Sequence, residues 1–205
     1  MQASVPPLVL ASSSRSRRQL LANAGLAFEV DPPGIDEAQA TRSLLGERAS
    51  PQEIAETLAE MKALRVSARR PQALVVAGDS TLAANGRLFD KPPTIEAARK
   101  QLLALSGQAH ELFSSVVVAR AGVRIWHWNE RARLTMRPFG ERFLDAYLAR
   151  AGESVLGSVG AYQLEGLGAH LFSRVDGDYF TILGLPLLPL LSFLAGHGVG
   201  LEQAA

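Results

Sequence analysis

The first residues that could do chemistry follow a short apolar run near the start of the chain. Residues 8–11 are apolar, and Ser12-Ser13-Ser14-Arg15-Ser16-Arg17-Arg18 comes directly after them. This order predicts a buried strand, a hydroxyl-rich turn and the first turn of a helix. A helix N-terminus suits a phosphate because its backbone N–H groups are unpaired, whereas arginines oppose the helix dipole there unless an anion offsets them. The motif predicts an anion site, and the alternative is a serine cap followed by solvated arginines.

Two groups of carboxylates follow further along the chain. Asp79 ends the apolar run 73–77, whose composition is typical of a strand buried on both faces of a sheet. A carboxylate at the end of such a strand lies at the edge where α/β folds bind ligands, so Asp79 could hold a divalent metal or accept a proton from water. Asp is also a common turn residue, so a turn at Gly78-Asp79-Ser80 is the alternative. Asp36-Glu37 falls in an expected loop, where Glu37 could complete an oxygen site for magnesium or be solvated.

Two lysines and a glutamate could complete a site around these groups. Lys62 lies on a predicted helix over residues 51–69, where a surface charge is the simplest expectation. Lys91 is followed by two prolines that fix its backbone, so its ammonium could be aimed at a phosphate or paired with Asp90. Glu165 lies beside glycines that could let it face a ligand, although glycines more often only serve a turn.

Apolar spacing, caps and turn residues predict the elements that position these groups. The helix from Pro51 begins with a serine cap and a glutamate three residues later, and we expect Ile54, Leu58 and Met61 on its buried face. Alternating apolar residues predict strands at 28–30, 112–119 and 123–136. A helix is expected from the Thr94 cap to about 106, and a short helix at 186–195. Asn85-Gly86 and Asp176-Gly177 are typical hairpin turns, and the turn at Asp176-Gly177 would join strands at 169–175 and 179–183. Helices and strands alternate early and hairpins dominate later, which predicts an α/β fold with a mixed sheet flanked by helices.

Length and composition narrow the classes of protein that fit. The 205 residues suit one domain, 1–205, or one domain with two lobes, and 47% hydrophobic with 20% charged residues is ordinary for a soluble fold. A net charge of +1 argues against a nucleic-acid or anionic membrane partner, and the lack of cysteine excludes disulfides and thiolate chemistry. Residues 179–196 are uncharged, but glycine and prolines interrupt them, so we expect a buried strand, a turn and a helix there rather than a membrane span. Without a signal-peptide pattern, we expect a cytoplasmic protein.

Many of these segments, taken together, resemble the Maf family of nucleoside triphosphate pyrophosphatases, once described as septum-formation inhibitors. The resemblance runs from Leu8 to about Gly198. It is carried by Leu-Ala-Ser-Ser-Ser-Arg-Ser-Arg-Arg (10–18), Asp36-Glu37, Leu58-Ala59-Glu60-Met61-Lys62-Ala63, Gly78-Asp79-Ser80, Asp90-Lys91-Pro92, Leu105-Ser106-Gly107, Gly160-Ala161-Tyr162, Glu165-Gly166-Leu167-Gly168, Gly177-Asp178-Tyr179 and Gly184-Leu185-Pro186-Leu187.

The resemblance implies a fold, a reaction and a set of site residues. The implied fold is an elongated, twisted mixed sheet flanked by helices with a central cleft between two lobes, as in the inosine triphosphate pyrophosphatases, and homodimers are common. The implied reaction is hydrolysis of a nucleoside triphosphate to a monophosphate and pyrophosphate with a divalent metal, Mg²⁺ or Mn²⁺. Matching positions place Ser12 and Arg17 in the phosphate-binding turn, put Glu37, Lys62 and Lys91 in the same site, and assign Asp79 as proton acceptor. We expect Lys62 and Lys91 to be catalytic and Ser12, Ser14, Ser16, Arg17, Ser80 and Glu165 to bind the substrate. Asp79 and Glu37 are the expected metal ligands, and the sequence does not separate the roles of Asp79 as base and as metal ligand.

The chain departs from the family pattern at positions that matter for the substrate. Arg15 and Ser16 replace the proline and the following Arg or Trp of the family turn, and Met61 stands where an acidic residue is common. Ser80 is close to the threonine of the group acting on thymidine and uridine triphosphates, whereas Glu165 matches the 7-methyl-GTP group. The expected substrate is therefore a pyrimidine or modified nucleotide. The altered turn and Met61 leave an alternative function open, that of a nucleotide-binding regulator of cell division with little or no turnover.

Overall fold

A computed structural model describes residues 5–201 of the chain. The strands are β1 (Leu8–Leu10), β2 (Glu29–Val30), β3 (Leu74–Ala84), β4 (Arg87–Phe89), β5 (Ala109–Arg120), β6 (Val123–Met136) and β7 (Phe172–Asp176). The α-helices are α1 (Arg15–Asn23), α2 (Glu37–Gly46), α3 (Pro51–Arg69), α4 (Ile95–Leu105), α5 (Glu141–Ala151), α6 (Tyr179–Ile182) and α7 (Leu187–Ala195). Three 3₁₀ helices are η1 (Gly152–Gly157), η2 (Val159–Ala161) and η3 (Leu167–Leu171).

The strands form a mixed sheet in the order β2-β1-β3-β5-β6-β7, with β4 paired to β3. β1 is parallel to both β2 and β3, whereas β4 is antiparallel to β3 and β7 is antiparallel to β6. The predicted mixed α/β sheet flanked by helices is therefore confirmed. The chain divides into two compact units: unit 1 holds residues up to 79, 114–130 and from 184 onward, and unit 2 holds 80–113 and 131–183.

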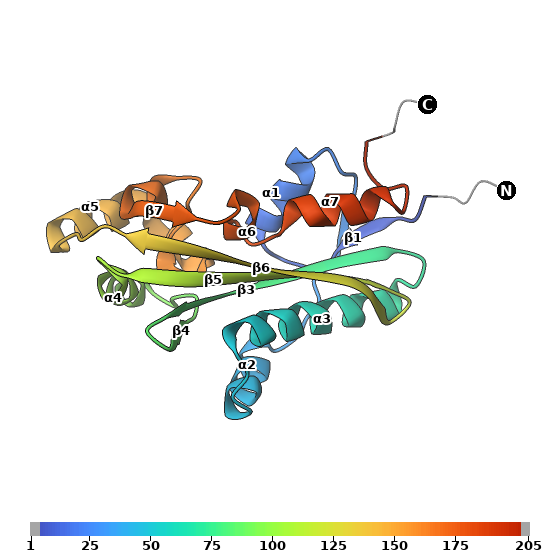
Figure 1. Cartoon of the computed structure of the whole chain (residues 1–205), viewed down its shortest axis with the longest axis horizontal. Helices are drawn as coiled ribbons and strands as arrows, with labels where there is room; N and C mark the ends of the chain where they lie inside the picture. Colours follow the sequence, from blue (N-terminus) through green and yellow to red (C-terminus); the bar gives the residue numbers. More distant parts are fainter. Residues whose placement is uncertain (1–4, 202–205) are drawn as a thin grey trace. The chain divides into compact units, whose positions relative to one another are not determined.

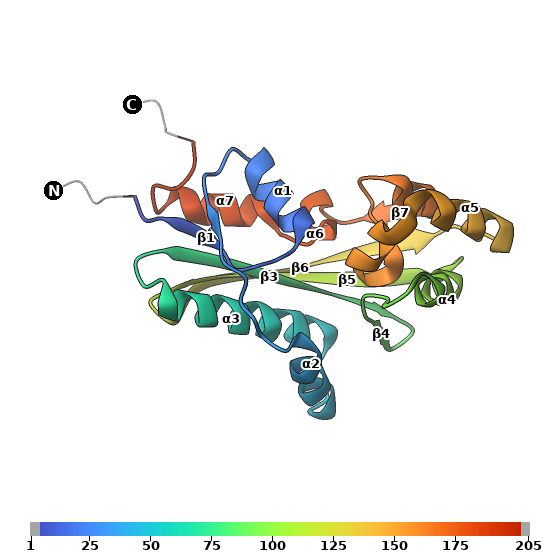
Figure 2. The same ribbon diagram turned by 180° about the vertical axis from the view of Figure 1, so that it is seen from behind.

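Unit 1 sandwiches its strands between helices. Figure 1 and Figure 2 both show α3 on one side of β1 and β3, with α1 and α7 on the other. The contact between α3 and the sheet is made of small side chains: Val9, Ala11, Ala59, Ala63, Val66, Ala73, Val75, Ala77, Val117 and Ala119. Such small side chains let the helix approach the sheet closely, so a residue on this face of α3 reaches the strands.

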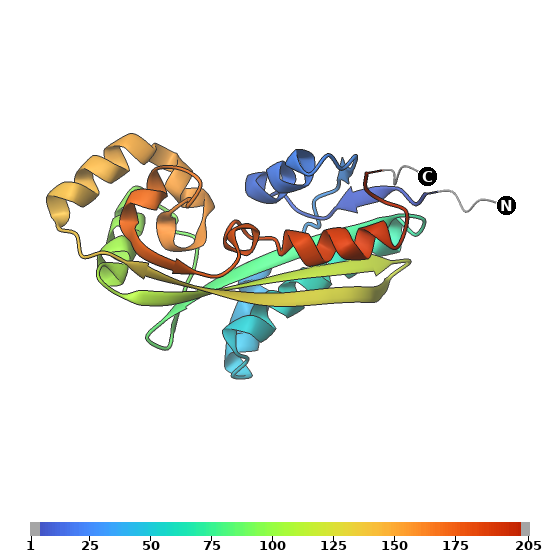
Figure 3. The same cartoon turned by 45° about the horizontal axis from the view of Figure 1, so that its top comes forward.

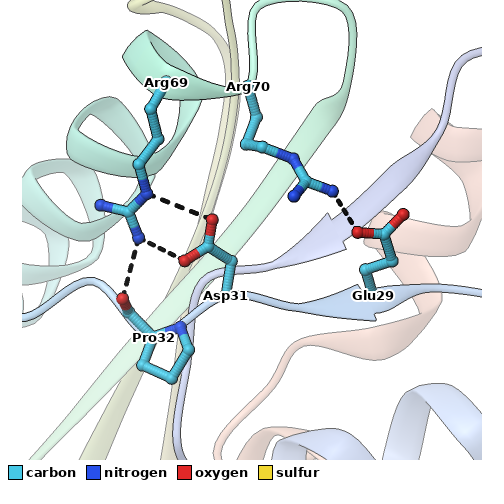
Figure 4. A network of polar contacts seen from close by, with 5 residues as sticks. All are labelled: Glu29, Asp31, Pro32, Arg69 and Arg70. Carbon is cyan, nitrogen blue, oxygen red and sulfur yellow. Dashed lines mark hydrogen bonds and ion pairs between the residues drawn. The ribbon is translucent and has the colours of Figure 1, made fainter.

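Both ends of α3 are fixed. At its start Ser50 and Glu53 form the predicted capping box, in which each side chain accepts the other's backbone N–H. At its end Arg69 pairs with Asp31 and donates to the carbonyl oxygen of Pro32 at 2.9 Å, and Arg70 pairs with Glu29 (Figure 4). Each exposed pair adds little stability by itself, but together they tie α3 to the segment that leads into α2.

Unit 2 has a separate core. In Figure 3 the gold α5 and the orange 3₁₀ turns lie beside the green α4, and α4 packs against α5, η1 and η2. Its largest fully buried side chains include Leu82, Leu102, Leu105, Leu134 and Leu144. No helix among residues 5–201 is long and apolar enough to cross a membrane.

Three expectations about the elements were wrong. Asp36-Glu37 does not lie in a loop, because the Asp36 carboxylate accepts from the backbone N–H of Gln39 at 2.9 Å and begins α2. Asp79 neither ends its strand nor forms a turn, because β3 continues to Ala84. Residues 179–182 form α6 rather than a hairpin strand, because the Asp178 carboxylate caps the Thr181 N–H at 2.8 Å.

Buried His110 on β5 makes the stability of unit 2 sensitive to acid. The side chain is 1% exposed and its Nε2 lies 2.8 Å from the Tyr162 hydroxyl oxygen. Burial lowers the pKa of His110 from 6.5 to about 4. Between these values the unfolded chain binds a proton that the folded chain excludes, so stability falls as the pH falls.

We expect the unfolding free energy to decrease by on the order of 3 kcal/mol through His110 as the pH falls from about 7 to about 4. Urea unfolding at several pH values measures it. In His110→Gln this part of the pH dependence disappears, whereas His170→Gln, which changes an exposed histidine of the same unit, keeps it. An unaltered pH dependence in His110→Gln would contradict the assignment.

Candidate active site

Lys62 is the centre of a compact cluster of charges in unit 1. Its Nζ lies 2.6 Å from Asp79 Oδ1 and 3.0 Å from Glu37 Oε2. Lys62 and Asp79 are 4% and 7% exposed, whereas about half of the Glu37 side chain is exposed. One ammonium therefore holds two carboxylates from different elements, α2 and β3, at one place.

The burial of Lys62 corrects the predicted face of α3. We expected Ile54, Leu58 and Met61 to face inward, but Met61 is 40% exposed and Lys62 lies inside. Ile54 and Leu58 are buried as predicted. The buried side of the helix also includes Ala55, Ala59 and Val66, which are spaced at i, i+4 and i+11 and share their face with position 62. This alanine stripe was the sequence signal for Lys62, and the larger side chain of Met61 obscured it.

The carboxylates owe their positions to strand and helix geometry. Asp79 lies within β3, where alternation puts it on the same face as Val75 and Ala77, which pack against the small residues of α3. Glu37 is the first residue of α2 and so lies at a helix N-terminus, where a carboxylate is favoured by the helix dipole. With Lys62 near the middle of α3, three elements contribute one charged group each.

The serine-rich turn after β1 is built from its own hydroxyls. The Ser12 side chain accepts from the Ser14 N–H at 3.1 Å, and the Ser14 side chain accepts from the Arg17 N–H at 3.4 Å, which caps α1. A hydroxyl that accepts a backbone proton still has its own proton to donate. Both serines thus shape the turn and retain a donor for an anion.

Arg17 joins the same cluster from α1. It is 8% exposed and lies on the buried stripe of the helix with Leu20 and Leu21. Its Nε donates to the carbonyl oxygen of Gly184 at 2.7 Å. Burial lowers the pKa of the Arg17 guanidinium, whereas attraction to Asp79 and Glu37 raises it. A guanidinium stays charged in proteins, so Arg17 contributes a second cation to the cluster.

The other predicted site residues are Ser16, Ser80, Lys91 and Glu165. Ser16 is half-buried in the first turn of α1, in unit 1. Ser80 is half-buried on β3 directly after Asp79, and Lys91 and Glu165 are exposed; these three residues belong to unit 2. The structure thus brings together Arg17, Glu37, Lys62 and Asp79, and the convergence of Lys91 and Glu165 on them stays a prediction.

The cluster combines two cations with two carboxylates, a set that suits a phosphate and a hard metal ion. Carboxylate oxygens are the ligands that Mg²⁺ prefers, and it commonly uses only one or two of them together with water and substrate phosphates. Among residues 5–201 no group of three or more His, Cys, Asp or Glu side chains could hold a metal by itself. A metal held by Asp79 and Glu37 would therefore need ligands from outside the protein.

Sequence reasoning missed the backbone carbonyl of Gly184 as a partner of Arg17. Every residue has a backbone carbonyl, so the residue types in the sequence do not indicate which carbonyl accepts a hydrogen bond from Arg17. The same holds for the close approach of Gly78 to Arg17, where an added Cβ would lie 3.0 Å from Nε.

Comparison with known proteins shows the family of this chain. The chain is 52% identical over 195 residues, 95% of its length and 98% of the relative's, to a protein of Caulobacter vibrioides named nucleoside triphosphate pyrophosphatase. It is 54% identical over 93% of its length to one of Paramagnetospirillum magneticum with the same name, which is covered to 98%. A Rhizobium etli protein named 7-methyl-GTP pyrophosphatase is 50% identical over 94% of this chain and 97% of its own. Residues 7–197 match the family described as Maf-like protein, and the chain belongs to that family.

Proposed function

We propose that this protein hydrolyses a nucleoside triphosphate to the nucleoside monophosphate and pyrophosphate at the cluster around Lys62. The observation that carries the proposal is that Lys62 and Arg17 meet Asp79 and Glu37 within one unit. Phosphoryl transfer depends mainly on positioning and charge neutralisation, which two fixed cations and two carboxylates supply. The names of relatives about half identical to this chain support the same reaction.

Each residue of the cluster has its own role in the proposed reaction. Arg17 and the hydroxyl-rich turn at Ser12 bind the phosphates, and Lys62 exchanges its carboxylate partners for phosphate oxygens. Asp79 accepts the proton of the water that attacks the α-phosphorus, and the α–β bridging oxygen leaves with pyrophosphate. A divalent metal, held by Asp79 and Glu37, would draw charge from the phosphates and lower the pKa of a bound water.

The substrate is proposed to be a modified or pyrimidine nucleotide. The relatives include proteins named 7-methyl-GTP pyrophosphatase, and Glu165 matches that group, whereas Ser80 is close to the thymidine and uridine triphosphate group. Lys91, Ser16, Ser80 and Glu165 would contact the substrate. We further propose a cytoplasmic homodimer that acts on free nucleotides rather than on nucleic acid or membranes.

Asp79→Asn should lower kcat by about two to four orders of magnitude, because the amide neither accepts the proton nor holds the metal equally well. Lys62 keeps Glu37 as a partner in this variant, so the fold should persist, which circular dichroism checks. Release of pyrophosphate, measured with added inorganic pyrophosphatase, gives the rate. Asp145→Asn, the same change at an exposed acid paired with Arg99, serves as the matched control. Full activity in Asp79→Asn would remove the central assignment.

Metal binding should depend on the nucleotide, because Asp79 and Glu37 supply only part of a coordination shell and both already contact Lys62. Calorimetry with Mn²⁺ should give weak binding to the protein alone. Binding should tighten at least tenfold when a triphosphate with a methylene group between the α- and β-phosphates is present. Chelation should abolish turnover and added Mg²⁺ or Mn²⁺ should restore it. Tight Mn²⁺ binding without nucleotide would contradict this scheme.

A panel of normal, methylated and deaminated triphosphates decides between turnover and regulation. We expect monophosphate and pyrophosphate as products, with the highest kcat/KM for a pyrimidine or 7-methylated guanine nucleotide. Tight binding across the panel without product would favour the alternative, a nucleotide-binding regulator.

A further inference from the structure

Arg17 occupies a position that an apolar residue would fill in an ordinary helix. It lies at i, with Leu20 and Leu21 at i+3 and i+4, on the buried stripe of α1. Burying a charge costs free energy unless other groups compensate it. Here Asp79 and Glu37 attract the guanidinium, and the Gly184 carbonyl oxygen accepts from its Nε. The arginine is thus held in the core by specific partners.

The bond to Gly184 fixes the orientation of the guanidinium. It is 2.7 Å long, buried, and joins residues 167 positions apart in the chain. The donor is Nε, the guanidinium nitrogen closest to the backbone, so this bond uses neither terminal nitrogen. Gly184 adopts φ +101°, which side-chain-bearing residues rarely adopt, and its carbonyl direction depends on that conformation.

Gly78 provides the space through which Arg17 passes. A Cβ at this position would lie 3.0 Å from Arg17 Nε, 3.4 Å from its Cδ and 3.1 Å from the Ser115 carbonyl oxygen. Ser115 belongs to a neighbouring strand and cannot easily move, so the strain would fall on the arginine side chain. Glycine inside a strand commonly marks such a close approach.

We propose that Gly78 and Gly184 are positioning residues that lock the Arg17 guanidinium beside Asp79 for phosphate binding. Gly78 leaves room for the side chain next to the strand, and Gly184 holds Nε from the opposite end of the chain. The locked guanidinium needs no reordering when the substrate binds, so less conformational entropy is lost. This inference rests on the proposed role of Arg17 in binding a triphosphate.

A double-mutant cycle tests the lock. Gly78→Ala should lower kcat/KM about tenfold, mainly through KM, because Arg17 is displaced from its phosphate-binding position. In an Arg17→Ala background the same change should alter kcat/KM less than twofold, because no guanidinium remains to displace. Gly46→Ala, a glycine of unit 1 with open space around it, is the matched control and should leave kinetics unchanged. Equal losses in both backgrounds, or none in either, would overturn the proposal.

A second measurement tests whether Arg17 is held in place, and it does not depend on catalytic turnover. In ¹H–¹⁵N spectra the Arg17 Nε–H, identified by its loss in Arg17→Ala, should exchange slowly with solvent in the wild type. It should exchange at least tenfold faster in both Gly78→Ala and Gly184→Ala, with melting temperatures recorded alongside. Fast exchange in the wild type would refute the lock. Absence of hydrolysis and of binding to the methylene triphosphate, with a protected Nε–H, would instead refute the proposed function.

Discussion

The close approach of α3 to the sheet governs the rest of the site. Lys62 reaches Asp79 and Glu37 only because its neighbours on the helix face are alanines that pack on small residues of β1, β3 and β5. Larger side chains at this contact would move the helix outward and leave the carboxylate of Asp79 buried without its cation. Removing one partner of a buried pair is strongly unfavourable, so packing and electrostatics are coupled at this point.

The cluster is balanced in charge before any ligand arrives. Arg17 and Lys62 carry two positive charges, and Glu37 and Asp79 can carry two negative charges. In the proposed reaction Arg17 would meet the phosphates in its present position, and Lys62 would turn from Asp79 and Glu37 to phosphate oxygens. Asp79 and Glu37 would then be the residues to hold a divalent metal that arrives with the triphosphate. Such an exchange of partners never leaves a buried charge unpaired, which explains how a protein of net charge +1 could bind a polyanion locally.

The site also joins distant parts of the chain. Arg17 from the first helix contacts the carbonyl oxygen of Gly184, just before the C-terminal helix α7, and that helix is anchored by stacking of Phe193 on Trp126 of β6. Arg69 and Arg70, at the end of α3, fix the segment that leads to Glu37 (Figure 4). The charged groups therefore rest on elements that are themselves held by packing and ion pairs, which keeps their spacing within hydrogen-bond range.

Local signals in the sequence determined many of the element types and ends, and the motifs that indicated the family. Caps at Ser14, Ser50 and Thr94 and the turn at Asn85-Gly86 depend on residues a few positions apart, so the sequence alone specifies them. Only the tertiary structure decided that Asp79 lies inside a strand, that Lys62 rather than Met61 is buried, and that a glycine carbonyl holds Arg17. The reason is physical: burial of a charge depends on partners from other elements, and a backbone carbonyl leaves no trace in residue type.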